Sequence, residues 1–144
     1  GCIGKEEGSA TMQMRTFTQS GRVPVTVFHL EGDLDADSHE QLQQQATEAL
    51  AAGSRHMLLD LSKVRYMSSS GLRAIYQIFV MLRENVPGES DEGVRAEIAA
   101  GTYHSPNLKL LKPSARVSQV LSAAGFDMFL EIHSELRTAI ESFG

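Results

Sequence analysis

The sequence has one cysteine and no tryptophan, and its 144 residues contain no long apolar run. Cys2 has no second thiol with which to form an internal disulfide, which is typical of proteins from a reducing compartment. The most apolar segment, residues 74–82, is interrupted by Gln77 and is much shorter than the ~20 residues that a membrane-spanning helix needs. We therefore expect a cytoplasmic protein without membrane insertion.

Acidic residues outnumber basic ones, and the formal net charge is −5. This balance argues against a broad nucleic-acid-binding surface. The apolar fraction of 42% is ordinary for a globular protein, and the length suffices for one domain with a proper core. We expect that domain to span residues 12–144. The polar, glycine-rich residues 1–11 are expected to be a disordered tail or a remnant of cloning.

The first half of the chain contains three strand patterns. Apolar alternation predicts strands over residues 12–18 and 23–30, joined by a hairpin turn at residues 19–22. A polar turn is expected at residues 31–35. The continuous apolar run of residues 56–61 is typical of a parallel strand that helices cover on both faces.

A helix is predicted between the second and third strands. Its start has two possible capping boxes, Asp37 with Glu40 or Ser38 with Gln41, in which each side chain bonds the backbone N–H of the other residue. Gly53 is a natural end for this helix.

The next predicted helix, over residues 70–84, has a wider apolar face than one core contact requires. Tyr76, Val80 and Met81 widen the stripe of core-facing residues. Either a neighbouring segment covers these side chains, which is the favoured interpretation, or part of the helix is a docking surface for a protein partner.

The second half begins with an irregular stretch, residues 85–106, which we interpret as a mobile insertion. A strand over residues 108–111 follows, then a helix from Ser114, a short strand near residues 128–130 and a final helix capped by Ser134. This order predicts an α/β fold: a single domain whose mixed, mostly parallel sheet of four to five strands is flanked by about four helices.

Patterns typical of enzymes are missing. There is no phosphate-binding loop or dinucleotide fingerprint, and Met67 occupies the position where a nucleophile elbow around Ser69 would need glycine. No two histidines have metal-ligand spacing. The five are His29, His39, His56, His104 and His133. We expect a protein that is not an enzyme and uses neither a metal nor another cofactor.

Three consecutive hydroxyls, Ser68, Ser69 and Ser70, stand where the third strand leads into the helix over residues 70–84. Either Ser69 or Ser70 is expected to cap the helix, and capping alone would account for both residues. Three hydroxyls exceed what one cap requires. The positive end of a helix also tolerates a phosphate dianion well, so the segment is suited to display one modifiable serine.

The segment from Met67 to Leu72, preceded by Asp60-Leu61-Ser62, resembles the signature of STAS domains, in particular the bacterial anti-sigma-factor antagonists. Gly32-Asp33-Leu34-Asp35 is similar to the acidic loop that follows the second strand in that family. Residues 108–125 fit its C-terminal portion, and the likeness extends over about residues 12–143 apart from the insertion.

The resemblance implies that Ser69 is the serine that a partner kinase phosphorylates. Ser70 matches the family's second serine, and Gly71 matches the glycine that allows a tight turn into the helix. Ser68 stands where the family usually has aspartate, so it is also a rival phosphorylation site, as is Ser70. Asp35 matches an acidic loop residue near the serine.

The partners that the resemblance implies are a serine-kinase-type anti-sigma factor, bound by the unphosphorylated form, and a serine phosphatase that restores this form. We expect the partner-binding surface to comprise Asp35, Ser68, Ser70, Gly71, Arg73 and Tyr76. The sequence favours no oligomeric state.

Two alternatives stay open. One is a STAS scaffold subunit of a transporter or of a stress-sensing assembly. The other is a nucleotide-binding STAS domain, in which the turn of residues 68–71 cradles a phosphate and only Arg65 and Arg73 supply positive charge nearby.

Overall fold

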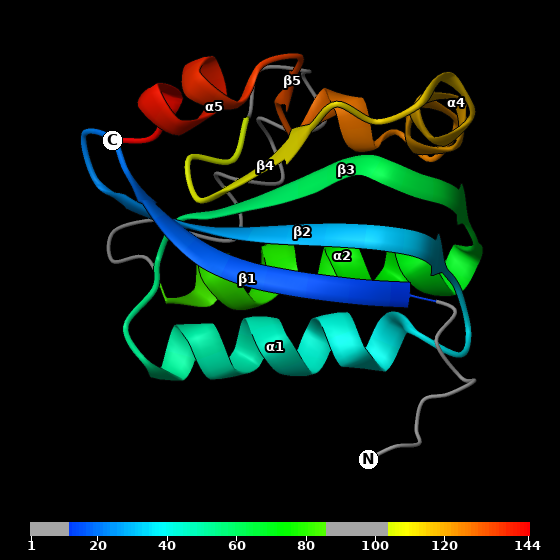
Figure 1. Cartoon of the computed structure of the whole chain (residues 1–144), viewed down its shortest axis with the longest axis horizontal. Helices are drawn as coiled ribbons and strands as arrows, with labels where there is room; N and C mark the ends of the chain where they lie inside the picture. The colour runs from blue at the N-terminus through cyan, green and yellow to red at the C-terminus, as the bar shows by residue number, and fades with distance from the viewer. Residues whose placement is uncertain (1–11, 86–103) are drawn as a thin grey trace.

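The computed structural model describes residues 12–85 and 104–144, which form a five-stranded sheet with helices on both faces (Figure 1). The strands lie in the order β1-β2-β3-β4-β5; β1 is antiparallel to β2 and the other neighbours are parallel. The elements are β1 Met12–Ser20, β2 Pro24–Leu34, α1 His39–Ala51, β3 Met57–Met67, α2 Ser69–Glu84, β4 Leu108–Leu111, α4 Ala115–Ala123, η2 Phe126–Met128, β5 Ile132–His133 and α5 Leu136–Ser142. The predicted fold class is confirmed.

Two expected segments lie outside this description. Residues 1–11 and 86–103 are not described, so the tail, the insertion over residues 85–106 and the extent of the domain stay predictions. None of the described helices is long and apolar enough to cross a bilayer.

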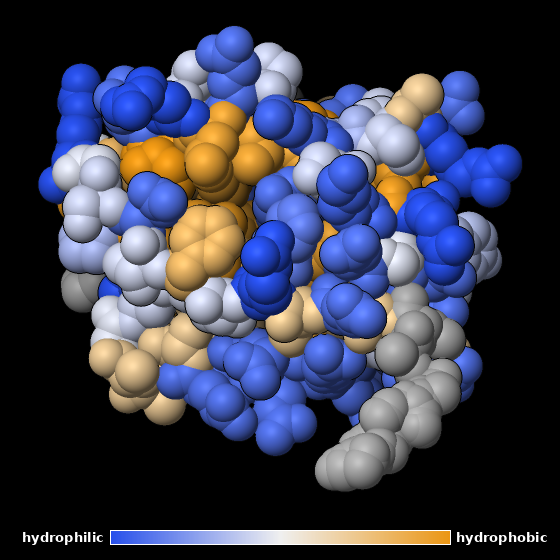
Figure 2. All heavy atoms as spheres, viewed as in Figure 1, coloured by the Kyte–Doolittle hydropathy of each residue, from blue (hydrophilic) through white to orange (hydrophobic). Residues whose placement is uncertain are grey.

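Side chains of the central strands point alternately to the two faces of the sheet and form one apolar cluster on each face. On one face of β2, Phe28 and Leu30 belong to the large core that α1, α2 and α4 cover. On the opposite face, Val25 and Val27 pack with the C-terminal helix α5 through Ile140. Figure 2 shows apolar side chains gathered on this second face near α5, with hydrophilic side chains over much of the remainder.

β2 and β3 both extend farther than the sequence indicated. The expected polar turn at residues 31–35 is wrong, because β2 continues to Leu34 and pairs with β3 through two register shifts. The Asp60 carboxylate supports this irregular pairing: it accepts hydrogen bonds from the Ser62 backbone N–H at 3.0 Å and the Ser62 hydroxyl at 2.7 Å. Polar side chains therefore continue the strands where an apolar pattern ends.

The predicted capping box of α1 is also wrong. Ser38 occupies the N-cap position, but its side chain makes no cap hydrogen bond. Instead its buried hydroxyl donates to the Asp33 carbonyl at 2.7 Å and accepts from the Asp35 backbone N–H at 3.0 Å. The Ser38 hydroxyl thereby stabilises the loop that precedes α1. Gly53, with φ of 109°, follows the helix end as expected.

The region after α4 differs from the predicted strand at residues 128–130. Gly125 adopts a left-handed φ of 81°, and the chain then forms the 3-10 helix η2. The ring centroids of Phe126 and Phe129 lie 5.3 Å apart, and both side chains are largely buried. They form an aromatic cluster with Phe79 of α2. The short β5 comes later. Ser134 does not cap α5 either, since Glu135 is its N-cap residue and makes no side-chain cap bond.

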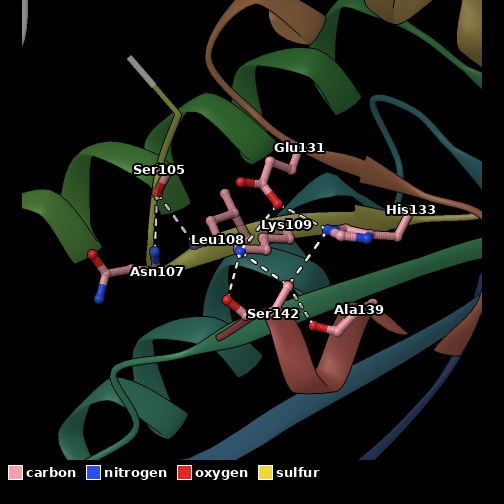
Figure 3. A network of polar contacts seen from close by, with 8 residues as sticks. All are labelled: Ser105, Asn107, Leu108, Lys109, Glu131, His133, Ala139 and Ser142. Carbon is pink, nitrogen blue, oxygen red and sulfur yellow. Dashed lines mark hydrogen bonds and ion pairs between the residues drawn. The ribbon is translucent and has the colours of Figure 1, made fainter. Parts of the chain in front are cut away.

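A buried lysine anchors α5 to the sheet (Figure 3). The Lys109 side chain is only 5% exposed. Its ammonium group donates to Glu131 Oε1 at 3.1 Å and to the carbonyl and hydroxyl of Ser142 at 3.2 and 2.9 Å. It also lies 4.9 Å from the centroid of the Phe143 ring. Because these contacts satisfy the charge, a lysine can occupy an interior position of β4.

Glu131 is expected to contribute pH-dependent stability. Burial alone would raise the pKa of Glu131, but hydrogen bonds from Lys109 and His133 lower it below its ordinary value. The stabilisation is therefore present at neutral pH and is lost as the pH falls through the lowered pKa of the folded state. We expect Glu131→Gln to lower the Tm at pH 7 by about 3 °C, corresponding to about 1 kcal/mol because Glu131 is 38% exposed and partly screened.

Thermal unfolding at neutral pH, and at acidic pH stepped down past the ordinary glutamate pKa, checks this result. The Tm values of parent and variant should become equal once the native Glu131 carboxylate is protonated, because its pKa is lowered in the folded state. Glu141→Gln is the matched control. Its pair with Arg137 spans 3.7 Å between well-exposed side chains and should contribute little at either pH. Equal Tm values for parent and Glu131→Gln at pH 7 would contradict the anchoring role.

Candidate functional site

The three serines lie at the junction of β3 and α2, beside the end of β2. Leu34 and Met67 are paired at the ends of their strands, and the Ser68 backbone N–H donates to the Leu34 carbonyl at 3.0 Å. The loop after β2 and the serine segment are therefore held side by side. Two rigid strands and the first turn of α2 fix their positions.

Ser68 is the N-cap of α2. Its Oγ accepts hydrogen bonds from the backbone N–H groups of Ser70 at 3.2 Å and Gly71 at 3.3 Å. The expected cap by Ser69 or Ser70 is therefore wrong, because Ser68 makes it. Aspartate and serine are similarly good N-cap residues, so this contact gives a physical reason why serine can stand where the resemblance leads us to expect aspartate.

Ser69 is the first residue of α2 and is exposed. Within residues 12–85 and 104–144, no hydrogen bond engages its hydroxyl, whereas Ser68 and Ser70 are partly buried. The side chain lies where the positive end of the helix dipole favours negative charge. A rigid support and an accessible hydroxyl therefore coincide at Ser69.

Ser69, Arg73 and Tyr76 follow one another at i, i+4 and i+7, which places them on one exposed side of α2. Tyr76 is 43% exposed. Its ring also rests on the aromatic cluster, with centroids 5.8 Å from Phe79 and 6.2 Å from Phe129. One side of the Tyr76 ring is thus exposed to solvent while the other packs against aromatic rings, an arrangement suited to contact with another protein.

Two further residues of the wide apolar stripe are not part of this surface. Val80 and Met81 are partly buried and pack against the main core. The Thr47 hydroxyl of α1 also lies 3.7 Å from the Met81 sulfur. The favoured interpretation, in which a neighbouring segment covers the excess, is therefore confirmed for these two residues.

Gly71 is required for close packing. It lies within α2 and is not among the glycines with left-handed φ, so the expected tight turn is not the reason for its presence. A Cβ at this position would approach the Leu34 carbonyl oxygen to 2.6 Å and the Leu34 Cγ to 2.9 Å. Only glycine lets the first turn of α2 approach β2 this closely.

Asp35 directs its carboxylate into its own loop. Its Oδ1 accepts a hydrogen bond from the Asp37 backbone N–H at 3.0 Å and lies 3.3 Å from the Ser38 hydroxyl. Its location immediately after Leu34 nevertheless brings it to the same end of the sheet as the serines. Loop stabilisation accounts for the contacts of Asp35, and a role in partner binding stays a prediction.

A basic groove near this end of the sheet was missed in the sequence. It has a volume of about 680 Å³ and is open to solvent. Its lining includes Gln13, Glu31, Ser62, Lys63, Arg65 and Arg116. The Arg65 Nε atom lies 3.5 Å from Asp33 Oδ1, near the end of β2. The available signal was the alternation Lys63-Val64-Arg65, but the contribution of Arg116 required the tertiary fold.

The cap by Ser68 leads to a measurable expectation. Ser68→Ala leaves the N–H groups of Ser70 and Gly71 without their acceptor and should cost about 1 kcal/mol, or about 3 °C in Tm. Ser68→Asp keeps an acceptor at the helix start and should leave the Tm within about 1 °C of the parent. Thermal denaturation followed by circular dichroism measures both, and equal losses in the two variants would rule out capping as the role of Ser68.

Comparison with known proteins agrees with this geometry. The chain matches the family model of the STAS domain over residues 16–86, just under half of its length. It is 35% identical over 60 residues to BtrV of Bordetella bronchiseptica, which carries the name of an anti-sigma factor antagonist. That alignment covers 42% of this chain, and the chain spans about half, 51%, of the length of the relative.

Solved structures extend the likeness over most of the chain. An anti-sigma factor antagonist from Mycobacterium paratuberculosis has a TM-score of 0.64 at 17% identity, covering 90% of this chain and 91% of its own. The phosphorylated form of the Bacillus cell fate determinant SpoIIAA has a TM-score of 0.59 at 18% identity, covering 90% and 97%. At these identities the likeness establishes the fold.

Proposed function

We propose that this protein is an anti-sigma-factor antagonist whose binding is switched by phosphorylation of Ser69. The unphosphorylated protein binds a serine-kinase-type anti-sigma factor and so releases the sigma factor. Phosphorylation by that kinase ends the binding, and a serine phosphatase restores it. The observation that carries the proposal is the exposed Ser69 hydroxyl at the start of α2, next to a neighbour that already supplies the helix cap.

The division of roles between Ser68 and Ser69 favours Ser69 over its rivals. A phosphate on Ser68 would disturb the oxygen that accepts two backbone hydrogen bonds. Ser70 is partly buried, and its N–H is one of those two donors. A phosphate on Ser69 displaces no hydrogen bond within the described chain, so modification there should leave the folded state intact.

The proposed binding surface is the end of the sheet where the serine segment and the loop after β2 meet. Ser69, Arg73 and Tyr76 supply its exposed helical side, and Asp35 supplies its loop side. A phosphoserine adds roughly −1.5 to −2 charges at pH 7. That charge would lie in the middle of the interface, where a partner that presents carboxylates or apolar surface would lose affinity.

The nucleotide-binding alternative is weakened by the same cap. A phosphate cradle at residues 68–71 would use the free N–H groups at the start of α2. Two of these, from Ser70 and Gly71, already bond the Ser68 hydroxyl. A constitutive scaffold interface would use the exposed apolar side of α2 at Tyr76, Val80 and Met81. Only Tyr76 is exposed, while Val80 and Met81 pack against the core, so the scaffold alternative is weakened as well.

The test is incubation of the purified chain with its cognate kinase-type anti-sigma factor and ATP, followed by mass-spectrometric location of phosphate. We expect one phosphate, on Ser69. Ser69→Ala should accept none and should stay bound to the partner in the presence of ATP. Ser70→Ala is the matched control and should be modified like the parent. Phosphate found only on Ser68 or Ser70, or none with an active kinase, would refute the proposal.

A further inference from the structure

Strand β1 forms a long, unpaired edge of the sheet. It runs from Met12 to Ser20 and pairs with β2 on one side, and in the described chain no strand lies on its other side (Figure 1). An edge strand directs the N–H and C=O groups of alternate residues away from the sheet. The opposite edge, β5, has only two residues. The principal free backbone edge of this fold, as far as the structure describes it, is therefore β1.

β1 lacks the features that usually prevent edge-to-edge pairing. It contains no proline and no lysine, and its register with β2 is continuous over all nine residues without a bulge. Arg15 is its only charged residue. Phe17 is 39% exposed on this strand, as one of the few large apolar side chains that the described surface presents. An edge this long, straight and weakly charged is suited to accept another strand.

The sequence of β1 is complementary to itself in one antiparallel register. With Thr16 opposite Thr16 of a second copy, Arg15 lies opposite Phe17, Gln13 opposite Gln19 and Met14 opposite Thr18. No two like charges face each other, and the Arg15 guanidinium can stack on the Phe17 ring twice, once on each side of the axis. We propose that two copies of this chain pair through β1 in this register and form a continuous ten-stranded sheet.

The fold leaves space beside this edge on both faces. Thr16 and Thr18 point to the face that α1 and α2 cover, yet both are exposed, so none of the described helices closes over the edge there. Arg15 and Phe17 point to the other face and are exposed as well. The pairing is isologous, with each copy using the same strand, and it closes at two copies. It is independent of Ser69, which lies beyond the end of β3.

Cysteine cross-linking tests the register. In a Cys2→Ser background, Thr16→Cys would place two thiols directly opposite each other on the axis, where Cα atoms are about 4.5 to 5.5 Å apart and a disulfide can form. Arg15→Cys is the matched control, because its thiol would face the Phe17 ring of the other copy instead of a second thiol. Under mild oxidation, we expect the Thr16→Cys variant to become mostly covalent dimer and the Arg15→Cys variant to stay mostly monomer. Equal yields, or the reverse order, would overturn the proposed register.

A charge-exchange series tests the pairing without cysteine. Phe17→Lys places an ammonium group opposite Arg15 of the other copy and should convert a species of twice the chain mass into monomer by sedimentation equilibrium. Adding Arg15→Glu should restore the dimer, because the introduced carboxylate and the introduced ammonium group then face and attract each other. Circular dichroism confirms folding of each variant. A parent chain that sediments as monomer at all accessible concentrations would overturn the dimer, while the Ser69 phosphorylation test would be unaffected.

Discussion

Ser69→Asp is expected to weaken binding to the anti-sigma factor about a hundredfold, which corresponds to about 2.7 kcal/mol. The reason is the placement of a permanent negative charge at an exposed position that the partner must cover. The fold should not change, because the Ser69 hydroxyl makes no hydrogen bond within the described chain and an acidic residue is favourable in the first turn of a helix. Calorimetric titration of the purified partner, together with the Tm of the variant, measures both effects.

Ser20→Asp provides the control for this measurement. Ser20 is also exposed, but it lies at the hairpin end of β1, opposite Pro24 and thus at the other end of the sheet from Ser69. The same added charge there should leave the affinity unchanged. If Ser69→Asp binds like the parent, or if Ser20→Asp weakens binding equally, the effect does not arise from charge at the proposed interface.

Gly71→Ala is expected to cause the largest loss of stability among the substitutions considered. The added methyl group would lie 2.6 Å from the Leu34 carbonyl oxygen and 3.1 Å from the Met67 Cγ. Backbone cannot yield as a flexible side chain does, so α2 would have to shift away from the strand ends. We expect a cost of about 2–3 kcal/mol, or about 5–10 °C in Tm, even though alanine favours helices.

Gly125→Ala separates crowding from backbone strain. Gly125 has a left-handed φ of 81°, and no atom lies within 4 Å of the position that a Cβ would take. Its substitution should cost only about 1 kcal/mol, from conformation alone. The shift of α2 in Gly71→Ala should also reduce partner affinity, because it moves Ser69 with the helix. A Tm loss for Gly71→Ala no larger than that for Gly125→Ala would show that the close approach to Leu34 is relaxed in solution.

Sequence patterns were most reliable where apolar residues repeat with a regular period. The helix from residue 70, the strand at Leu108–Leu111 and the helix after Ser114 were predicted close to their observed positions, because their apolar side chains mark one buried face. Patterns failed where polar residues continue an element. Lys63 and Arg65 lie in β3 because its backbone continues to pair with β2. The local amino-acid composition does not indicate that pairing.

The site was predicted in part. The resemblance implied that the loop at Asp35 lies near the serine segment, and the hydrogen bond from Ser68 to Leu34 places the two segments side by side. The helix cap was expected at Ser69 or Ser70, which is wrong, because the three serines have equal capping chemistry and only the position at which α2 begins selects Ser68. The reason for Gly71 was also predicted wrongly. The local sequence suggests a tight turn, whereas the residue must be glycine because Leu34, on another strand, leaves no space for a Cβ.

The order of residues by itself determined that this chain forms alternating strands and helices and that a cluster of hydroxyls follows a buried strand, because both properties depend on neighbours a few positions apart. Only the tertiary structure decided which serine is exposed, why a glycine must follow it, how a lysine can be buried in β4 and which strand is left with an open edge. Each of these depends on contacts between segments far apart in the chain, such as Leu34 with Gly71 and Lys109 with Ser142.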